Sequence, residues 1–167
     1  VTGFKPDLVW TKSRSHGHWH AVYDSLRGPN YTLCPNETVD QYIPDEYGDM
    51  LMSFDETGFT LGADGTVNSV NDSDSTYVAW AWKAGGSSAD FMKDGEEDTS
   101  IAAGGSISPD KMSVNTKAGF SIVKYEGNGT NNSTVPTGLD DVDFAIVKNL
   151  NRGAGSGNAV SNSQWVV

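Results

Sequence analysis

The sequence of 167 residues contains one cysteine, Cys34, so the chain cannot form a disulfide within itself. Basic residues are also few, since 11 Lys and Arg stand against 22 Asp and Glu and the formal net charge is −11. Binding to phosphate backbones or anionic headgroups needs clustered Lys and Arg, so we expect no nucleic-acid partner and no anionic membrane surface. No apolar run approaches the roughly 20 residues of a spanning helix, and we expect no membrane insertion.

A helical apolar period is missing as well, because no stretch sustains one for more than two turns. The sequence has instead 19 glycines and many Asn, Ser, Thr and Asp residues, which favour turns and polar loops. Short runs of strand-forming residues lie between these loops, so the composition predicts an all-β chain. The clearest strands are expected at residues 7–12, 18–23, 50–54, 76–83 and 120–125.

Residues 76–83 (TYVAWAWK) have the strongest strand pattern of the chain. Alternation places Trp80 and Trp82 on one face of this strand. If exposed, their rings would form a platform for stacking on sugars, and if buried they would be part of the core. Because a strand this apolar is more often interior, we interpret the pair as core.

A segment near the beginning of the sequence recurs near its end. Residues 2–12 (TGFKPDLVWTK) return as residues 137–148 (TGLDDVDFAIVK), with Asp141 as one inserted residue. A tryptophan and a short apolar strand follow each copy, beginning at Trp19 and at Trp165. The shared order indicates a duplication, and repeats of this size are typical of arrays and shafts. We predict that the two copies occupy structurally equivalent strands.

The order of five motifs resembles a repeat family of virion structural and tail-fibre-like proteins of tailed bacteriophages, especially marine and cyanobacterial ones. The motifs are GFKPDLVWTK (3–12), WHAVYDSLRG (19–28), SFDETGFTLG (53–62), YVAWAWKAGG (77–86) and GFSIVKYEGNGT (119–130). The resemblance implies a concanavalin-like or jelly-roll β-sandwich and a location in the virion. It also implies other virion proteins and copies of the same chain as partners, often in a trimer, and it supplies no catalytic residue.

The motifs divide the chain into three expected segments. Residues 1–86 form the main β-sandwich repeat, and residues 87–118 form an irregular connector rich in acidic residues, Gly and Ser. Residues 119–167 either begin a second repeat or supply strands that complete the sandwich. The sequence leaves these two possibilities open.

All three histidines of the chain lie within five residues, as His16, His18 and His20. On a strand, residues i, i+2 and i+4 project to the same side, so three imidazoles could bind one transition-metal ion. Gly17 and the polar residues before it suggest instead that His16 belongs to a solvated loop. Both interpretations stay open.

Oxygen-bearing side chains alternate in residues 71–75 (NDSDS), where Asp72 and Asp74 could bind Ca²⁺ together with other loop oxygens. The acidic run 94–98 (DGEED) could do the same. The glycine and the closing glutamate of an EF-hand loop are missing from 71–75. The alternative for both segments is a solvated turn in an acidic protein.

A glycan on the host surface is the partner expected for the aromatic residues near loops, because an aromatic ring has an apolar body with a defined face. The chain would then act as a lectin-like carbohydrate-binding module, alone or as part of a virion protein. The candidate glycan-binding residues are Trp10, Trp19, Tyr23, Tyr31, Tyr42 and Tyr47.

Catalysis has little support in the sequence, and we expect that the chain is not an enzyme. Glycoside hydrolysis needs two carboxyl groups at a set separation, but 22 acidic residues make such a pair nearly inevitable. Cys34 has no histidine near it in the sequence, and no phosphate-binding loop, nucleophile elbow or zinc spacing occurs. A glycan depolymerase is therefore a minor alternative.

Overall fold

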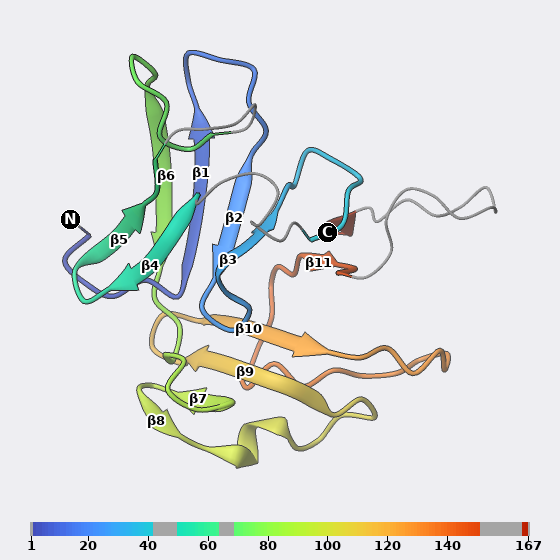
Figure 1. Ribbon diagram of the computed structural model, residues 1–167. Helices are drawn as coiled ribbons and strands as arrows, with labels where there is room; N and C mark the ends of the chain where they lie inside the picture. Colours follow the sequence, from blue (N-terminus) through green and yellow to red (C-terminus); the bar gives the residue numbers. More distant parts are fainter. Residues whose placement is uncertain (1, 42–49, 64–68, 151–164, 167) are drawn as a thin grey trace.

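The computed structural model describes residues 2–41, 50–63, 69–150 and 165–166 (Figure 1). Its regular elements are β-strands and one short 3₁₀ helix, η2 (Thr99–Ala102), and the described residues include no α-helix. The all-β prediction is therefore confirmed. Most strands belong to two four-stranded sheets that the segment after β6 connects.

The first sheet has the strand order β3-β2-β1-β6, with every neighbouring pair antiparallel. Its strands are β1 (Leu8–Ser13), β2 (Ala21–Asp24), β3 (Gly28–Leu33) and β6 (Tyr77–Trp82). Burial alternates along β1, where Val9, Thr11 and Ser13 point inward. This period of two matches the sequence pattern and gives the sheet an inner and an outer face.

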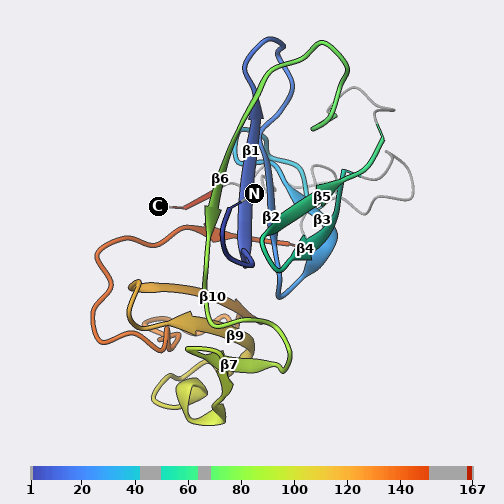
Figure 2. The same cartoon turned by 90° about the vertical axis from the view of Figure 1, so that its left-hand side faces the viewer.

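A hairpin of β4 (Leu51–Asp55) and β5 (Gly58–Leu61) packs on the inner face of this sheet, as Figures 1 and 2 show. The first core contains Val9, Tyr23 and Leu51, none of which is exposed to solvent. Burying a large apolar side chain stabilises the fold by about 1.5–3 kcal/mol, so this core holds the hairpin on the sheet.

The second sheet has the order β10-β9-β7-β8 and its own core of Ile101, Met112 and Val114. Its strands are β7 (Phe91–Lys93), β8 (Glu96–Glu97), β9 (Pro109–Asn115) and β10 (Phe120–Tyr125). The pairing of β7 with β9 is parallel, and the other pairings in this sheet are antiparallel. Figure 1 shows β9 and β10 running crosswise below the first sheet.

Residues 87–118 differ from the irregular connector that we expected, because they contain β7, β8, η2 and β9. The acidic run 94–98 supports turns here. The Asp94 carboxylate accepts hydrogen bonds from the Thr116 N–H and hydroxyl, and the Asp98 carboxylate caps η2 by accepting those of Ser100. These hydrogen bonds lower the pKa of both carboxyl groups.

Residues 84–86 connect the two sheets through buried and partly buried hydrogen bonds. The Asp7 carboxylate, 2 % exposed, accepts the N–H groups of Ala84 at 2.8 Å and Gly86 at 3.3 Å. From the second sheet, the Ser113 hydroxyl accepts the Gly85 N–H at 2.9 Å and donates to the Gly86 carbonyl at 2.7 Å. A carboxylate and a hydroxyl thus hold this short segment from opposite sides.

The two copies of the repeat begin with the same turn. In each copy the threonine hydroxyl accepts the N–H of the residue two positions later at 3.4 Å, and the intervening glycine has a positive φ of 81° or 72°. Glycine suits both positions because side chains disfavour this backbone region. The residues are Thr2, Gly3 and Phe4 in the first copy and Thr137, Gly138 and Leu139 in the second.

Further along, the second copy repeats the antiparallel pairing of β1 with β2, but over fewer residues. Strand β11 (Val147–Lys148) pairs antiparallel with β12 (Trp165–Val166), and Lys148 lies opposite Trp165. Relative to the β1–β2 pair, this register is shifted by one residue. Within the described ranges, no counterpart of β6 lies beside β11. The equivalence of the two copies is local, and a complete second repeat stays a prediction.

Candidate functional site

The outer face of the first sheet carries a row of aromatic side chains. Trp10 on β1 lies opposite Trp80 on β6, and their ring centroids are 5.9 Å apart at an interplanar angle of 64°. Trp80 is 44 % exposed, and Trp82 is 36 % exposed while stacking on Phe120 at 6.2 Å. The assignment of Trp80 and Trp82 to the core is therefore wrong, because β6 is an edge strand with its tryptophan face outward.

His20 extends this row instead of joining a metal cluster. The Trp10 Nε1–H donates to His20 Nδ1 at 2.9 Å, and the two ring centroids are 5.6 Å apart. Burial lowers the pKa of His20, and the positive charge of Lys12 lowers it further. A neutral imidazole is the form that accepts this hydrogen bond, so the pKa shift and the geometry agree. We call Trp10, Trp80, Trp82 and His20 the aromatic row.

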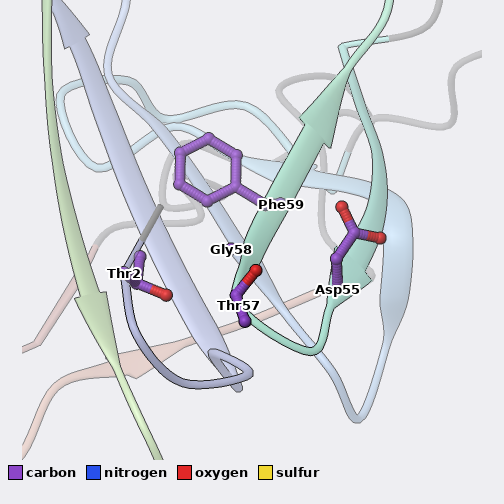
Figure 3. Close-up of a pocket in the computed structure, with 5 residues that line it drawn as sticks. All are labelled: Thr2, Asp55, Thr57, Gly58 and Phe59. Atoms are coloured by element: carbon purple, nitrogen blue, oxygen red, sulfur yellow. The ribbon is translucent and has the colours of Figure 1, made fainter.

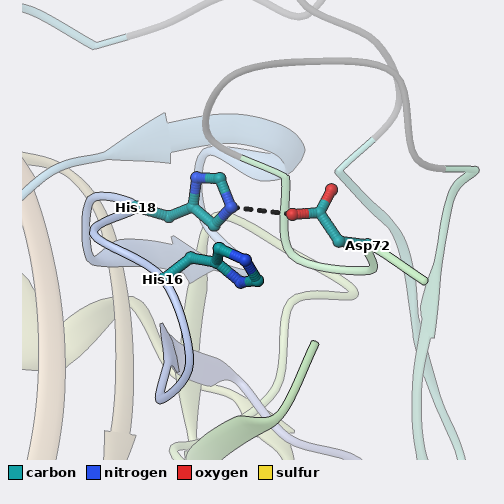
Figure 4. A group of neighbouring side chains, drawn as sticks. All are labelled: His16, His18 and Asp72. Carbon is teal, nitrogen blue, oxygen red and sulfur yellow. Dashed lines mark hydrogen bonds and ion pairs between the residues drawn. The ribbon is translucent and has the colours of Figure 1, made fainter. Parts of the chain in front are cut away.

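The other two histidines meet one of the predicted calcium ligands. His16, His18 and Asp72 each offer a ligand atom, and these atoms all lie within 4.8 Å of one another. His18 Nε2 is 2.7 Å from Asp72 Oδ2, at hydrogen-bonding distance. Figure 4 shows both imidazoles projecting from the β1–β2 loop toward Asp72, which precedes β6. The fold thus combines residues that the sequence divided between two candidate sites.

Hydrogen bonds to backbone groups hold these two loops together. The Arg14 N–H donates to the Thr76 carbonyl at 2.6 Å, and the Thr76 N–H donates to the Ser15 hydroxyl at 3.0 Å. The Lys12 ammonium group donates to the His18 carbonyl at 2.9 Å and fixes the other end of the β1–β2 loop. The positions of His16, His18 and Asp72 therefore follow from the pairing of β1 with β6.

The comparisons with known proteins identify a family without a known function. The family described as "Domain of unknown function (DUF7483)" matches residues 1–166. The chain belongs to this family. No curated protein and no solved structure matches it.

The match to the DUF7483 family covers both sheets and both copies of the repeat. The matched segment of this chain thus contains both the aromatic row and the cluster of His16, His18 and Asp72. Among the described residues of this DUF7483 chain, no helix is long and apolar enough to span a bilayer.

The predicted glycan residues of the DUF7483 chain have different environments. Trp10 belongs to the aromatic row, and Trp19 and Tyr31 are partly buried. Tyr23 is fully buried in the first core, where burial raises its pKa, so its assignment to a glycan surface is wrong. Alternation along β2 directs this side chain inward. The remaining two candidates, Tyr42 and Tyr47, lie outside the described residues.

Asp74 does not join the cluster of His16, His18 and Asp72. It is exposed and has a positive φ of 62°, a conformation typical of a turn. The cluster contains two imidazoles and one carboxylate, whereas Ca²⁺ prefers six to eight oxygen ligands. This donor set does not favour calcium at Asp72.

A small surface pocket lies at the turn between β4 and β5, a place that the sequence did not indicate. Figure 3 shows its lining residues, Thr2, Asp55, Thr57, Gly58 and Phe59. The Asp55 carboxylate accepts hydrogen bonds from the Ser53 and Thr60 hydroxyls at 2.7 and 2.8 Å, which lower its pKa. An ionised carboxylate with these partners stabilises the hairpin and is poorly suited to donate a proton.

Proposed function

We propose that this chain is a non-catalytic structural module of a bacteriophage particle, in a tail fibre or on the particle surface, that contributes to attachment to the host. The order of its sequence motifs supports the assignment to a virion. The observation that supports attachment is the exposed aromatic row, which we propose binds a glycan of the host surface.

The chemistry of the aromatic row favours a carbohydrate partner. The Trp80 ring is 44 % exposed and lies on an edge strand. Exposed positions on edge strands usually carry polar or charged residues, so a large aromatic ring there is unusual. Tryptophan offers a large, rigid apolar face and a polar N–H group, and sugars present C–H groups beside hydroxyls. The net charge of −11 disfavours anionic polymers. We therefore propose a neutral glycan.

We also propose that the fold is a concanavalin-like or jelly-roll β-sandwich. The β4–β5 hairpin packed over the inner face of a four-stranded sheet supports it, because this is the layering of a sandwich. The aromatic row would then lie on the outside of the sandwich, available to a ligand.

The experiment that tests glycan binding is a screen of the full chain on a glycan array, with and without Ca²⁺, followed by titration of the best neutral sugar. We expect Trp80→Ala to weaken binding at least tenfold, equivalent to about 1.4 kcal/mol. Met52→Ala is the matched control, because Met52 is a 42 % exposed apolar side chain outside the row. No binding at millimolar sugar, or an equal loss in both variants, would contradict the glycan proposal.

Assembly into homo-oligomers is the second part of the proposed function. Exposed apolar side chains alternate along the second copy of the repeat at Val142, Phe144 and Ile146. Exposed apolar side chains grouped in this way are typical of a surface that packs against a neighbour. Light scattering of the full chain tests this idea. We expect an oligomer, which in a fibre would be a trimer, and a strict monomer at high concentration would contradict it.

A glycan depolymerase remains the minor alternative. Incubation of the chain with host polysaccharide should release no new reducing ends. Their appearance would show that the chain is an enzyme and would overturn the non-catalytic assignment.

A further inference from the structure

We propose that His16, His18 and Asp72 bind one divalent transition-metal ion, with Zn²⁺ as the best fit, and that this ion joins the β1–β2 loop to the segment before β6. The inference is independent of glycan binding, because the cluster is separate from the aromatic row. It also differs from both ion sites expected from the sequence, since His20 and Asp74 are outside it.

The donor set favours Zn²⁺. Two imidazole nitrogens and one carboxylate oxygen supply three protein ligands, and Zn²⁺ commonly completes such a set with water in the fourth position. Imidazole suits first-row transition metals, whereas Ca²⁺ and Mg²⁺ prefer oxygen ligands. The partly exposed location of the cluster leaves access for an ion and for its remaining water ligand.

The distances require only small side-chain movements. Two ligands that hold one Zn²⁺ at 2.0–2.2 Å in tetrahedral geometry are about 3.3 Å apart. In the structure His18 Nε2 and Asp72 Oδ2 are 2.7 Å apart, and the ligand atoms of the whole cluster lie within 4.8 Å of one another. Binding would separate the first pair slightly and bring the ligand atom of His16 closer to both.

Hydrogen bonds already orient the His16 imidazole. Its Nδ1 is 3.1 Å from the Ser15 hydroxyl and 3.0 Å from the Ser75 hydroxyl, one from each loop. When Nδ1 carries the proton and donates it to one of these hydroxyls, Nε2 keeps the lone pair that binds a metal. Hydrogen bonds from the second ring nitrogen are typical of zinc-binding histidines.

The backbone around His18 is also fixed before any ion binds. Lys12 Nζ donates to the carbonyl oxygens of Ser13, His16 and His18 at 2.8, 3.4 and 2.9 Å, so its three N–H bonds have protein acceptors. Asp72 is held on the opposite side, where its N–H donates to the Tyr77 hydroxyl at 3.2 Å. Both halves of the site thus have fixed backbones.

The His18–Asp72 hydrogen bond holds the cluster together when no ion is bound. In that state the Nε2–H of His18 donates to the carboxylate. For an ion to bind at Nε2, the neutral ring must carry its proton on Nδ1 instead. The ion then replaces the proton between the two residues, and no oxidant, reductant or second reactant is needed.

The consequence of binding is a cross-link between residues that lie 54 positions apart in the sequence. Because an ion that binds only the folded chain stabilises it, saturating Zn²⁺ should raise the melting temperature by about 5 °C or more. This is a readout of the site that does not involve a sugar.

The test uses the full chain without an affinity tag, stripped of metal with EDTA, and titrated with ZnCl₂ in a calorimeter and in a thermal melt. We expect one ion per chain with a micromolar or lower dissociation constant. His18→Ala and Asp72→Asn should each weaken binding at least tenfold and abolish the rise in melting temperature.

Two matched controls separate this site from the alternatives. Asp74→Asn removes a carboxylate two residues from Asp72 and keeps a side chain that tolerates the φ of 62°, so Zn²⁺ binding should be unchanged. His20→Gln should also leave binding unchanged, whereas a loss equal to that of His18→Ala would point to the three-histidine site. No Zn²⁺ binding by the unsubstituted chain, or full binding by Asp72→Asn, would overturn the proposal.

A measurement on the unsubstituted chain keeps the proposal testable if a variant fails to fold. Diethylpyrocarbonate modifies neutral imidazoles, and mass spectrometry locates the modified residues. Zn²⁺ should protect His16 and His18 and leave the modification of His20 unchanged. If Zn²⁺ changed the modification of none of the three histidines, the site would be contradicted.

Discussion

The Asp7 carboxylate accepts the backbone N–H of Ala84 at 2.8 Å and thereby joins the start of β1 to the segment that leads into the second sheet. The same carboxylate accepts the Ser25 hydroxyl at 2.9 Å, and the Asp7 backbone N–H donates to the Trp82 carbonyl. One side chain therefore connects three segments that are distant in the sequence.

Replacing Asp7 with Asn should lower the free energy of unfolding by about 2–4 kcal/mol. The amide has one acceptor oxygen where the carboxylate has two, and its NH₂ group would face hydrogen-bond donors. Urea denaturation measures this loss. Asp143→Asn is the matched control, since Asp143 is the corresponding residue of the second copy of the repeat and is exposed. It should change stability by no more than about 0.5 kcal/mol, and equal effects of both substitutions would contradict the role of Asp7.

Gly85 should not tolerate a side chain. A Cβ atom there would lie 2.5 Å from the Val114 carbonyl oxygen and 2.6 Å from that of Met92, so backbone would have to move. We expect Gly85→Ala to cost about 2 kcal/mol or more in thermal or urea unfolding. Gly127→Ala is the control, because a Cβ at Gly127 has no neighbour within 4 Å. A stable Gly85→Ala variant would mean that the two sheets are joined differently.

The different environments of Trp80 and Tyr23 predict a different cost of truncation. Tyr23→Ala removes a fully buried ring and should destabilise the chain by about 3–5 kcal/mol, as large-to-small core substitutions do. Trp80→Ala removes a ring that is 44 % exposed and should cost about 1 kcal/mol. Chemical denaturation of the two variants compares these values. A larger cost for Trp80 would place the aromatic row inside the protein.

Cys34 should make the protein less stable in alkali. Burial raises the pKa of its thiol to about 12, and the negative charge of Glu37 contributes further. Between the unfolded thiol pKa near 9 and this folded value, the unfolded state releases a proton that the folded state keeps. The free energy of unfolding should therefore decrease with pH by up to about 1.4 kcal/mol per unit.

Urea denaturation between pH 8 and 11 measures this slope. Cys34→Ala should show a shallower slope, with a residual decrease from Tyr23, whose pKa burial also raises. In the native state the thiol should react slowly with a disulfide reagent at pH 8 and quickly after unfolding. Identical slopes with and without the thiol would contradict the burial of Cys34.

The strands themselves could be predicted from the sequence, because alternation of apolar and polar residues is local information. Strands β1, β2, β4, β6 and β10 each overlap an expected strand. Their order in the sheets is not local. The apolar run 76–83 predicts a core position for Trp80, and only the position of β6 at an edge explains its exposure.

Residues 87–118 were harder to predict because their core residues, Ile101, Met112 and Val114, do not form one apolar run, and polar side chains hold the turns between them. The carboxylates of Asp94 and Asp98 accept backbone N–H groups at two turns. The composition of this segment alone predicts an irregular loop. For the metal cluster, the sequence indicated its histidines and Asp72 separately. Their meeting depends on the pairing of β1 with β6, which lies beyond any sequence window.

That pairing has a consequence for how quickly the chain folds. Strand β1 has β2 as one neighbour and β6 as the other, and β2 to β5 are all synthesised after β1 and before β6. Pairing of β1 with β6 requires the long segment between them to lose conformational entropy, and such non-local pairing slows folding. Until β6 is synthesised and pairs, one edge of β1 is open to the strands that emerge before it. The order in which strands emerge during synthesis therefore decides which of them β1 meets first.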